Sequence, residues 1–500
     1  MCMKAGLLYR SKVECWQASR LYRNIAIFGE TATTPRGYGS TARRPKVIVT
    51  TTPTDLQIMP LDILESQETG STSYHRITAT CLASPQTSDF KMVGTTAPVA
   101  PPLRNQNAQS NGINSAAHVP SRVYSLSHPP SLASFETLCA QSANPDLYPQ
   151  ATSIVSNIPI YDLSSLPHTP NTARLQDEWH HILLSGPGVF VLRNFFTDTA
   201  LLQHINTVFD AIIASESSYE KGDHFAAFSK NGRIWNSFQK HAERDPASFV
   251  RYYANPWLAH VCEAWLGPAY QVTTQVNIVK PGGKPQVTHR DYHLGFQTAE
   301  ACSKFPKAMQ IASQLLTLQG AVAHSDMPLE SGPTRFLPFS QQFEEGFMAY
   351  RVKEFQEYFD RNWVSVELKM GDAVFFNPAL FHAAGENRTT DVDRSANLLQ
   401  VSSAMGRTME SIETLSIISK CWDEVRRLHA AAGMTSEVRA ILSAIGEGYP
   451  FPTNLDRRPP APGGMAPESE IDILQKALEQ GWSREEVLLS IKTIRKDAMP

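Results

Sequence analysis

Residues 282–296 read GGKPQVTHRDYHLGF, and the histidine and aspartate in this stretch decide how the fold is interpreted. The residues after the turn at 281–283 predict a β-strand over 286–293. Side chains two residues apart on a strand point to the same face, so His289 and Asp291 can converge on one ion. The preceding turn suits the mouth of a β-barrel. The stretch therefore predicts part of a metal site on a β scaffold.

A third ligand is expected from a later strand. His382 lies in residues 371–388, GDAVFFNPALFHAAGENR, where a Gly-Asp turn precedes an apolar β-run. Two histidines and one carboxylate on one face of a metal leave its other coordination positions open, which is the facial triad of non-haem Fe(II) oxygenases. His289, Asp291 and His382 are therefore the candidate metal ligands and the candidate catalytic centre.

A second His-x-Asp sequence, His324-Ser325-Asp326, competes for the same role. A jelly roll places several strands between the ligand pair and the third ligand. Five of the strands predicted below separate Asp291 from His382, whereas three separate Asp326 from His382. We therefore expect a structural or substrate-side role for the second pair.

Residues outside the triad complete the candidate site. Arg394 follows His382 by twelve residues, at the start of a predicted strand. An arginine binds a carboxylate through two hydrogen bonds and keeps its charge when buried, which suits the distal carboxylate of a 2-oxo acid whose keto-acid end chelates iron. Arg388 is the alternative, but it lies among turn residues and is expected in solvent.

His293 could be a fourth ligand, but we favour a hydrogen-bonding or pocket role, because another protein ligand would take a position that the co-substrate or oxygen needs.

Short β-runs between turn signals predict a mainly β domain, a sandwich or jelly roll, with flanking helices. The expected strands are residues 188–192, 270–279, 286–293, 309–319, 320–324, 334–339, 363–368, 373–377 and 395–403. Helical periodicity predicts helices over residues 171–184, 197–215, 246–266, 408–430 and 435–445. The barrel core, rather than a substrate pocket, is expected to contain Phe296, Phe336, Phe375 and Phe376.

The chain divides into four parts by composition. Residues 1–157 include long Ser-, Thr- and Pro-rich stretches, bury little apolar surface and are expected to be largely disordered. The folded domain is expected over residues 158–450. A Pro/Gly linker over 451–467 leads to a predicted helical hairpin over 468–500, whose second helix opens with a capping box at 483–486. We expect this hairpin to pack on the main domain, and docking of a partner is the alternative.

Composition argues against several classes of protein. A net charge of −3 argues against a general nucleic-acid binder. The sequence has no apolar run of about 18 residues, the length that spans a membrane. Its 7 cysteines are widely spaced and lack a Cys-x-x-Cys motif, which indicates a reducing compartment rather than a disulfide framework. We expect a cytoplasmic protein, and the nine basic and two acidic residues among 1–50 leave a mitochondrial presequence as the alternative.

Residues 171–403 resemble the phytanoyl-CoA dioxygenase family of Fe(II)- and 2-oxoglutarate-dependent oxygenases. The resemblance is carried by His289-Arg-Asp291, the turn at 330–332 with Leu337-Pro-Phe-Ser340, Gly371-Asp372, His382, Arg394 and the strand at 188–195. It implies a cupin-like double-stranded β-helix that uses Fe(II), 2-oxoglutarate and O2 and releases succinate and CO2, with ascorbate supporting turnover. It also implies oxidation, most simply hydroxylation, of a small organic substrate.

Departures from the family pattern leave the identity of the substrate open. The hydroxyl residue that often lies two positions after the third ligand is Ala384 here, and Thr334 is the candidate to supply a hydroxyl to 2-oxoglutarate instead. The family's common Pro-Gly-Ser-His is Leu337-Pro-Phe-Ser340. Halogenases of this group lack the carboxylate ligand, so Asp291 favours hydroxylation. Two rivals remain: a cupin-like Zn(II) isomerase or hydrolase in which Arg394 is incidental, and a non-catalytic scaffold that binds partners through its terminal segments.

Overall fold

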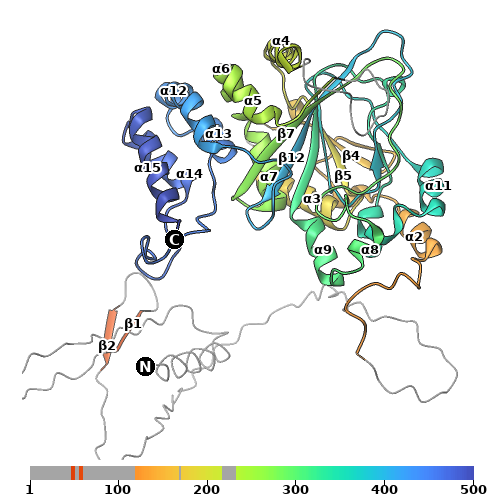
Figure 1. Cartoon of the computed structure of the whole chain (residues 1–500), viewed down its shortest axis with the longest axis horizontal. Helices are drawn as coiled ribbons and strands as arrows, with labels where there is room; N and C mark the ends of the chain where they lie inside the picture. Colours follow the sequence, from red (N-terminus) through yellow and green to blue (C-terminus); the bar gives the residue numbers. More distant parts are fainter. Residues whose placement is uncertain (1–46, 51–55, 60–118, 168–169, 217–231) are drawn as a thin grey trace, which may run out of the picture. The chain divides into compact units, whose positions relative to one another are not determined.

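The computed structural model describes residues 47–50, 56–59, 119–167, 170–216 and 232–500 (Figure 1). The chain divides into two units, residues 1–111 and 112–500. Strands β1 (Val47–Thr50) and β2 (Leu56–Met59) pair antiparallel in the first unit, and all other described elements lie in the second. Most of the basic segment that leaves a mitochondrial presequence as the alternative, and most of the expected disordered region, fall outside the described residues.

Eight strands of the second unit form one mixed sheet in the order β3-β4-β5-β10-β8-β12-β7-β6. The strands are β3 Ser153–Val155, β4 Ile158–Asp162, β5 Val189–Arg193, β6 Gly232–Ile234, β7 Tyr270–Val279, β8 Thr317–Ala323, β10 Ala373–Phe376 and β12 Arg394–Ser403. Only β4 and β5 run parallel, and every other neighbouring pair in this sheet is antiparallel. The order places β8 and β12, which are distant in sequence, side by side at the centre.

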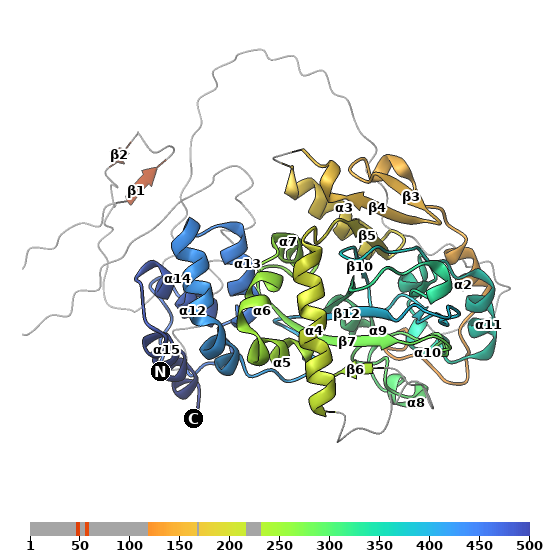
Figure 2. The same cartoon turned by 90° about the horizontal axis from the view of Figure 1, so that it is seen from above.

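The large sheet has two different faces, because side chains alternate along each strand. On β12, Leu399 and Val401 join the main hydrophobic core, whereas Leu398 and Gln400 line a cavity on the opposite face. Figure 2 shows helices gathered beside the core face, among them α4 (Thr199–Glu216), α5 (Ser237–Arg244), α6 (Pro246–Tyr253) and α7 (Pro256–Leu266). The sheet therefore separates a helix-packed core from the cavity.

A second, much smaller sheet borders the cavity opposite the large one. Its strands β9 (Arg335–Phe336) and β11 (His382–Ala383) pair antiparallel. Single bridges extend this pairing to His289 on one side and to Val364 on the other. A hydrophobic cluster joins the two sheets and includes Val191, Val374, Phe336 and Leu368.

The expectation of a mainly β domain is wrong, because helices contain more residues than strands in the described part of the chain. Residues 309–315 of one predicted strand belong to helix α9 (Lys307–Leu315). The predicted strands 286–293 and 363–368 form only isolated bridges. Part of the reason is that Tyr292 and His293 adopt positive φ angles of 64° and 43°, which end the extended segment.

Most other predicted elements are confirmed to within a few residues, although the helix expected from residue 408 begins at Thr414. Strands β5, β7, β10 and β12 match, as do α4, α6, α7 and three further helices: α3 (Thr172–Leu184), α12 (Thr414–Ala432) and α13 (Ser436–Ile445). These segments have strong periodicity and clear end signals, such as Gly433 and Gly446 after α12 and α13.

Regular structure begins before residue 158, where the sequence analysis starts the folded domain. Helix α2 (Leu132–Cys139) buries Phe135 completely, against Phe343 and Phe355. Phe355 belongs to α11 (Lys353–Asn362). Two short helices, α8 (Ala299–Cys302) and α10 (Gly346–Ala349), precede α11 in the sequence. A helix of 8 residues in a Ser- and Pro-rich segment gives little periodic signal, so its ordering depends on a distant aromatic cluster.

The C-terminal residues form the predicted hairpin of α14 (Glu470–Glu479) and α15 (Arg484–Asp497). Both helices open with capping boxes, including the predicted one at Ser483. Leu474 and Ile491 belong to the same hydrophobic core as α12 and α13, so the hairpin packs on the domain. No helix in the described ranges has the length and apolar character needed to cross a bilayer.

Candidate metal centre

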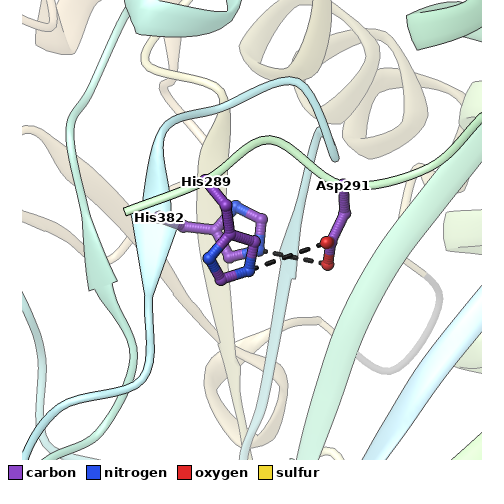
Figure 3. Close-up of side chains that lie close together, drawn as sticks. All are labelled: His289, Asp291 and His382. Atoms are coloured by element: carbon purple, nitrogen blue, oxygen red, sulfur yellow. Dashed lines mark ion pairs between the residues drawn. The ribbon is translucent and has the colours of Figure 1, made fainter. Parts of the chain in front are cut away.

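The side chains of His289, Asp291 and His382 converge at the cavity wall (Figure 3). One possible ligand atom from each residue lies within 4.8 Å of the others. Nε2 of His289 is 3.6 Å from Oδ1 of Asp291, and Nε2 of His382 is 3.4 Å from Oδ2. These separations exceed those of ordinary hydrogen bonds, so the three donors are spaced as ligands around a common ion would be.

The backbone holds the three ligands in register. The N–H of His289 donates to the carbonyl of His382 at 3.0 Å, and the N–H of His382 donates back at 3.1 Å. The N–H of Asp291 donates to the carbonyl of Pro378 at 2.9 Å. The predicted pairing of ligands two residues apart is thus correct in geometry, although a short bridge rather than a regular strand presents them.

Both histidines are oriented to bind a metal through Nε2. Nδ1 of His289 lies 2.8 Å from the carbonyl of Val287, and Nδ1 of His382 lies 2.8 Å from that of Leu380. A carbonyl can only accept, so each Nδ1 carries the proton and each Nε2 keeps its lone pair. Burial also lowers the pKa of His289, which favours the neutral, ligating form.

The carboxylate of Asp291 is held by side chains of the large sheet. Nε2 of Gln319 on β8 donates to Oδ2 of Asp291 at 2.6 Å and to Oε1 of Gln400 on β12 at 3.1 Å. Burial alone would raise the pKa of Asp291, but the two histidines and this hydrogen bond outweigh it and hold the pKa below its usual range. The aspartate is therefore an anion that is ready to bind a cation.

Arg290, between the two ligands, anchors their segment from behind. Its side chain is 1% exposed, and Nη2 donates to the carbonyls of Ser340 and Phe343 at 2.7 and 3.0 Å. A Cβ on Gly346 would lie 1.8 Å from the guanidinium carbon, so a larger residue there would displace the guanidinium. Sequence reasoning missed this role because the acceptors are backbone carbonyls of a loop some 50 residues later.

A cavity of about 520 Å³ lies between the two sheets and is bordered by the triad, Arg394 and Thr334. The Arg394 side chain is buried, and its Nη1 makes only long contacts of 3.5 Å to the carbonyls of Ser331 and Gly385. Across the described residues it has no ion pair, and burial lowers its pKa to about 10. A buried guanidinium that lacks a carboxylate and faces a cavity is suited to bind an anionic ligand.

The other candidates lie away from the centre. His324 and Asp326 do not border the cavity, and Arg388 is exposed, as expected. His293 turns away and contacts the hydroxyl of Thr317 at 3.4 Å, so the predicted hydrogen-bonding role holds.

The four phenylalanines divide between the two faces of the sheet. Phe375 lies in the helix-packed core as predicted. Phe336 and Phe376 are buried and also border the cavity, whereas Phe296 is 49% exposed at the cavity, which contradicts its core assignment. The cavity wall therefore contains aromatic surface that the sequence analysis assigned to core alone.

Gln319 and Gln400 are functional candidates that sequence reasoning missed. Gln400 lies six residues after Arg394 on the same strand and so faces the same side, which is a signal available in the sequence. Gln319 lies opposite Gln400 in the strand register, and that pairing cannot be read from sequence.

Comparison with known families identifies this region. Residues 185–396 match the family described as phytanoyl-CoA dioxygenase (PhyH). This segment is a phytanoyl-CoA dioxygenase family domain. The family is one of non-haem iron, 2-oxoglutarate-dependent enzymes, and the matched segment contains the triad, Thr334 and Arg394.

Individual relatives of the dioxygenase domain are distant. The dioxygenase andF of Emericella variicolor is 25% identical over 147 residues, which are 28% of this chain and 45% of that protein. The chain thus spans less than half the length of this curated relative. Two solved structures from nogalamycin biosynthesis, both of non-haem α-ketoglutarate-dependent enzymes, are also similar. The carbocyclase SnoK has a TM-score of 0.36 at 16% identity, covering 48% of this chain and 88% of its own. The epimerase SnoN has a TM-score of 0.33 at 17% identity, covering 47% and 83%.

Proposed function

We propose that this protein is an Fe(II)- and 2-oxoglutarate-dependent dioxygenase that oxidises, most simply by hydroxylation, a small organic substrate and releases succinate and CO2. The observation that carries the proposal is the convergence of two Nε2 lone pairs and one carboxylate beside a cavity. Two nitrogen donors and one oxygen donor form a three-ligand set that leaves positions open on an octahedral ion, which fits Fe(II). The two facing sheets support the double-stranded β-helix interpretation.

Iron bound here would supply O2 activation coupled to oxidative decarboxylation of 2-oxoglutarate, and the protein supplies position and surroundings. Arg394 binds the distal carboxylate of the co-substrate, because its buried guanidinium makes only two long contacts of 3.5 Å to carbonyls. Arg290 also borders the cavity, but carbonyl groups at 2.7 and 3.0 Å already hold its guanidinium. Gln319 fixes the Asp291 carboxylate, and the two backbone carbonyls fix the imidazole rings. Apolar side chains of both sheets exclude water from the centre.

A Zn(II) hydrolase or isomerase is the competing interpretation, and Arg394 argues against it. Such an enzyme needs no dicarboxylate co-substrate, and a buried arginine without a counter-charge would destabilise the fold with no compensating use. Thr334 borders the same cavity, which is compatible with a hydroxyl contact to 2-oxoglutarate.

The decisive experiment measures succinate released from 2-oxoglutarate by the full chain in the presence of ascorbate. We expect release with Fe(II), and none when Zn(II) replaces it. Equal turnover with Zn(II), or none with Fe(II) while the metal is bound, would contradict the proposal. Metal content measured on the same samples separates a failure to bind from a failure to react.

A further inference from the structure

Four side-chain amides line the cavity on the face of the large sheet. These residues, called the amide row below, are Gln275 and Asn277 on β7, Gln319 on β8 and Gln400 on β12. The strand register places Gln400 opposite Gln319, and it places Leu398 and Ala396 opposite Gln275 and Asn277. The row therefore runs across three neighbouring strands and begins beside the metal ligand Asp291.

The amide row, whose residues line the cavity, has unused hydrogen-bonding capacity. Gln319 uses both amide hydrogens, one to Asp291 and one to Gln400, so its Oε1 is an acceptor. That Oε1 is buried without a partner, and so is Oδ1 of Asn277. Nε2 of Gln275 reaches only the thioether sulfur of Met409, a weak acceptor, at 3.6 Å. Buried polar atoms are normally paired, so these atoms are expected to bind water or a ligand.

The cavity offers no charge partner for a cationic ligand. Among its described lining residues Asp291 is the sole carboxylate, and it is a candidate metal ligand. Arg394 is assigned to the co-substrate, and Arg233 donates to Oε1 of Gln275 and lies over the ring of Trp235. The other two arginines of the lining, Arg290 and Arg351, donate to backbone carbonyls. The lining also includes apolar side chains, among them Met327, Phe336, Val366 and Leu368. The cavity thus offers uncharged polar groups together with apolar surface.

We propose that the amide row is the substrate subsite and that the substrate is a neutral molecule with hydroxyl groups on an apolar skeleton. Substrate hydroxyls donate to Gln319 and Asn277, and a substrate oxygen accepts from Gln275. The inference rests on the proposed dioxygenase function. It adds the class of substrate and names the residues that select it.

The first test uses four probes built on one rigid fused-ring hydrocarbon skeleton: a diol, the hydrocarbon, a carboxylic acid and a primary amine. Succinate release by the full chain with Fe(II) and 2-oxoglutarate is compared with the rate without a probe. We expect the diol to accelerate release, and the hydrocarbon to give a kcat/KM at least about a hundredfold lower, because it leaves buried acceptors unpaired. Stimulation by the acid or the amine in preference to the diol, or no stimulation by the diol, overturns the inference.

A variant pair tests the residues themselves. Gln275→Leu and Asn277→Leu should each raise the KM for the diol about tenfold, the value of one lost hydrogen bond in a desolvated site. Gln271→Leu on the same strand is the matched control, since Gln271 lies outside the cavity and contacts Glu447. An unchanged KM in both row variants, or an equal rise in the control, refutes the assignment. Iron-dependent succinate release without any probe reports on the proposed function separately, so the two failures are distinguishable.

Discussion

The chain contains two His-x-Asp sequences of identical spacing, and the fold uses them in opposite ways. His289 and Asp291 point to the same side and meet His382 at the cavity. In the second sequence the two side chains separate. His324 is 1% exposed among aromatic residues of the helix-packed face, and Asp326 forms a surface ion pair with Lys369.

The difference lies in how each imidazole uses its nitrogens. In His289, Nδ1 donates a hydrogen bond to the backbone carbonyl of Val287, and Nε2 stays open for a metal. His324 uses both, since Nδ1 lies 2.7 Å from Oδ1 of Asn206 and Nε2 lies 3.0 Å from the hydroxyl of Tyr252. A His-x-Asp sequence is therefore a metal-site candidate only where one imidazole nitrogen stays open and a third ligand arrives by strand pairing.

The largest expected effect comes from replacing His289 and His324, one at a time, by alanine. His289→Ala should abolish Fe(II)-dependent succinate release, a greater loss than the roughly 100-fold that removal of an outer-shell partner of a metal ligand costs. Its thermal stability should change little. His324→Ala should instead lower the unfolding free energy by roughly 2–4 kcal/mol, because two buried partners lose their hydrogen bonds and a cavity forms.

Paired measurements of succinate release and of urea unfolding check both variants. Iron content distinguishes loss of the ligand from loss of folding. Retention of iron and turnover in His289→Ala, or selective loss of iron in a still folded His324→Ala protein, would reverse the assignment of the two sequences.

The second prediction compares the two arginines that follow His382, namely Arg388 and Arg394. Arg394→Leu should raise the KM for 2-oxoglutarate roughly 100-fold, because two charge-assisted hydrogen bonds are lost. Arg394→Lys, which keeps the charge without the fork, should raise it about tenfold. Arg388→Leu is the matched control and should leave this KM unchanged, since Arg388 is exposed. Equal KM values for Arg394→Leu and the wild type would remove Arg394 from the co-substrate site.

Sequence reasoning grouped the candidate ligands, which the structure brings together, better than it predicted the fold around them. The ligand spacing and the strand β12 that carries Arg394 are local features, so His289, Asp291 and Arg394 could be found from sequence. The small sheet could not be predicted, because it consists of short pairings and single bridges whose ends depend on positive φ angles at Tyr292 and His293.

Contacts between distant segments also escaped prediction. Helix α2 is ordered by packing of Phe135 against residues about 200 positions later, and no local pattern records that contact. Gln319 and Arg290 act through partners from other segments in the same way. Local periodicity therefore predicts which residues share a face, whereas tertiary pairing decides which faces meet.

Two buried histidines on the helix-packed face predict that the free energy of unfolding depends on pH, independently of the metal site. Burial lowers the pKa of His324 and His241 to about 3 each, so both stay neutral in the folded protein. The unfolded chain binds protons below a pKa of about 6.5, so the unfolding free energy falls as pH drops from about 6.5 toward 3, by up to about 1.4 kcal/mol per pH unit for each histidine. In His324→Asn one proton fewer is taken up on unfolding, so the dependence of the unfolding free energy on pH should be weaker by up to about 1.4 kcal/mol per pH unit. Urea unfolding between about pH 4 and pH 7 measures it, and identical slopes in the two proteins would show that His324 is protonated in the fold.

The smallest expected effect concerns Thr334, the residue proposed to replace the hydroxyl that Ala384 lacks. Thr334→Val removes one neutral hydrogen bond to 2-oxoglutarate and should raise its KM about fivefold, well below the effect of Arg394→Leu. Ala384→Ser restores a hydroxyl two residues after His382 and should offset part of that loss in the double variant. The four proteins form a double-mutant cycle measured by succinate release. Additive effects, in which Ala384→Ser helps equally with or without Thr334, would mean that the two positions do not share one carboxylate, and Thr334 would then be only a wall of the cavity.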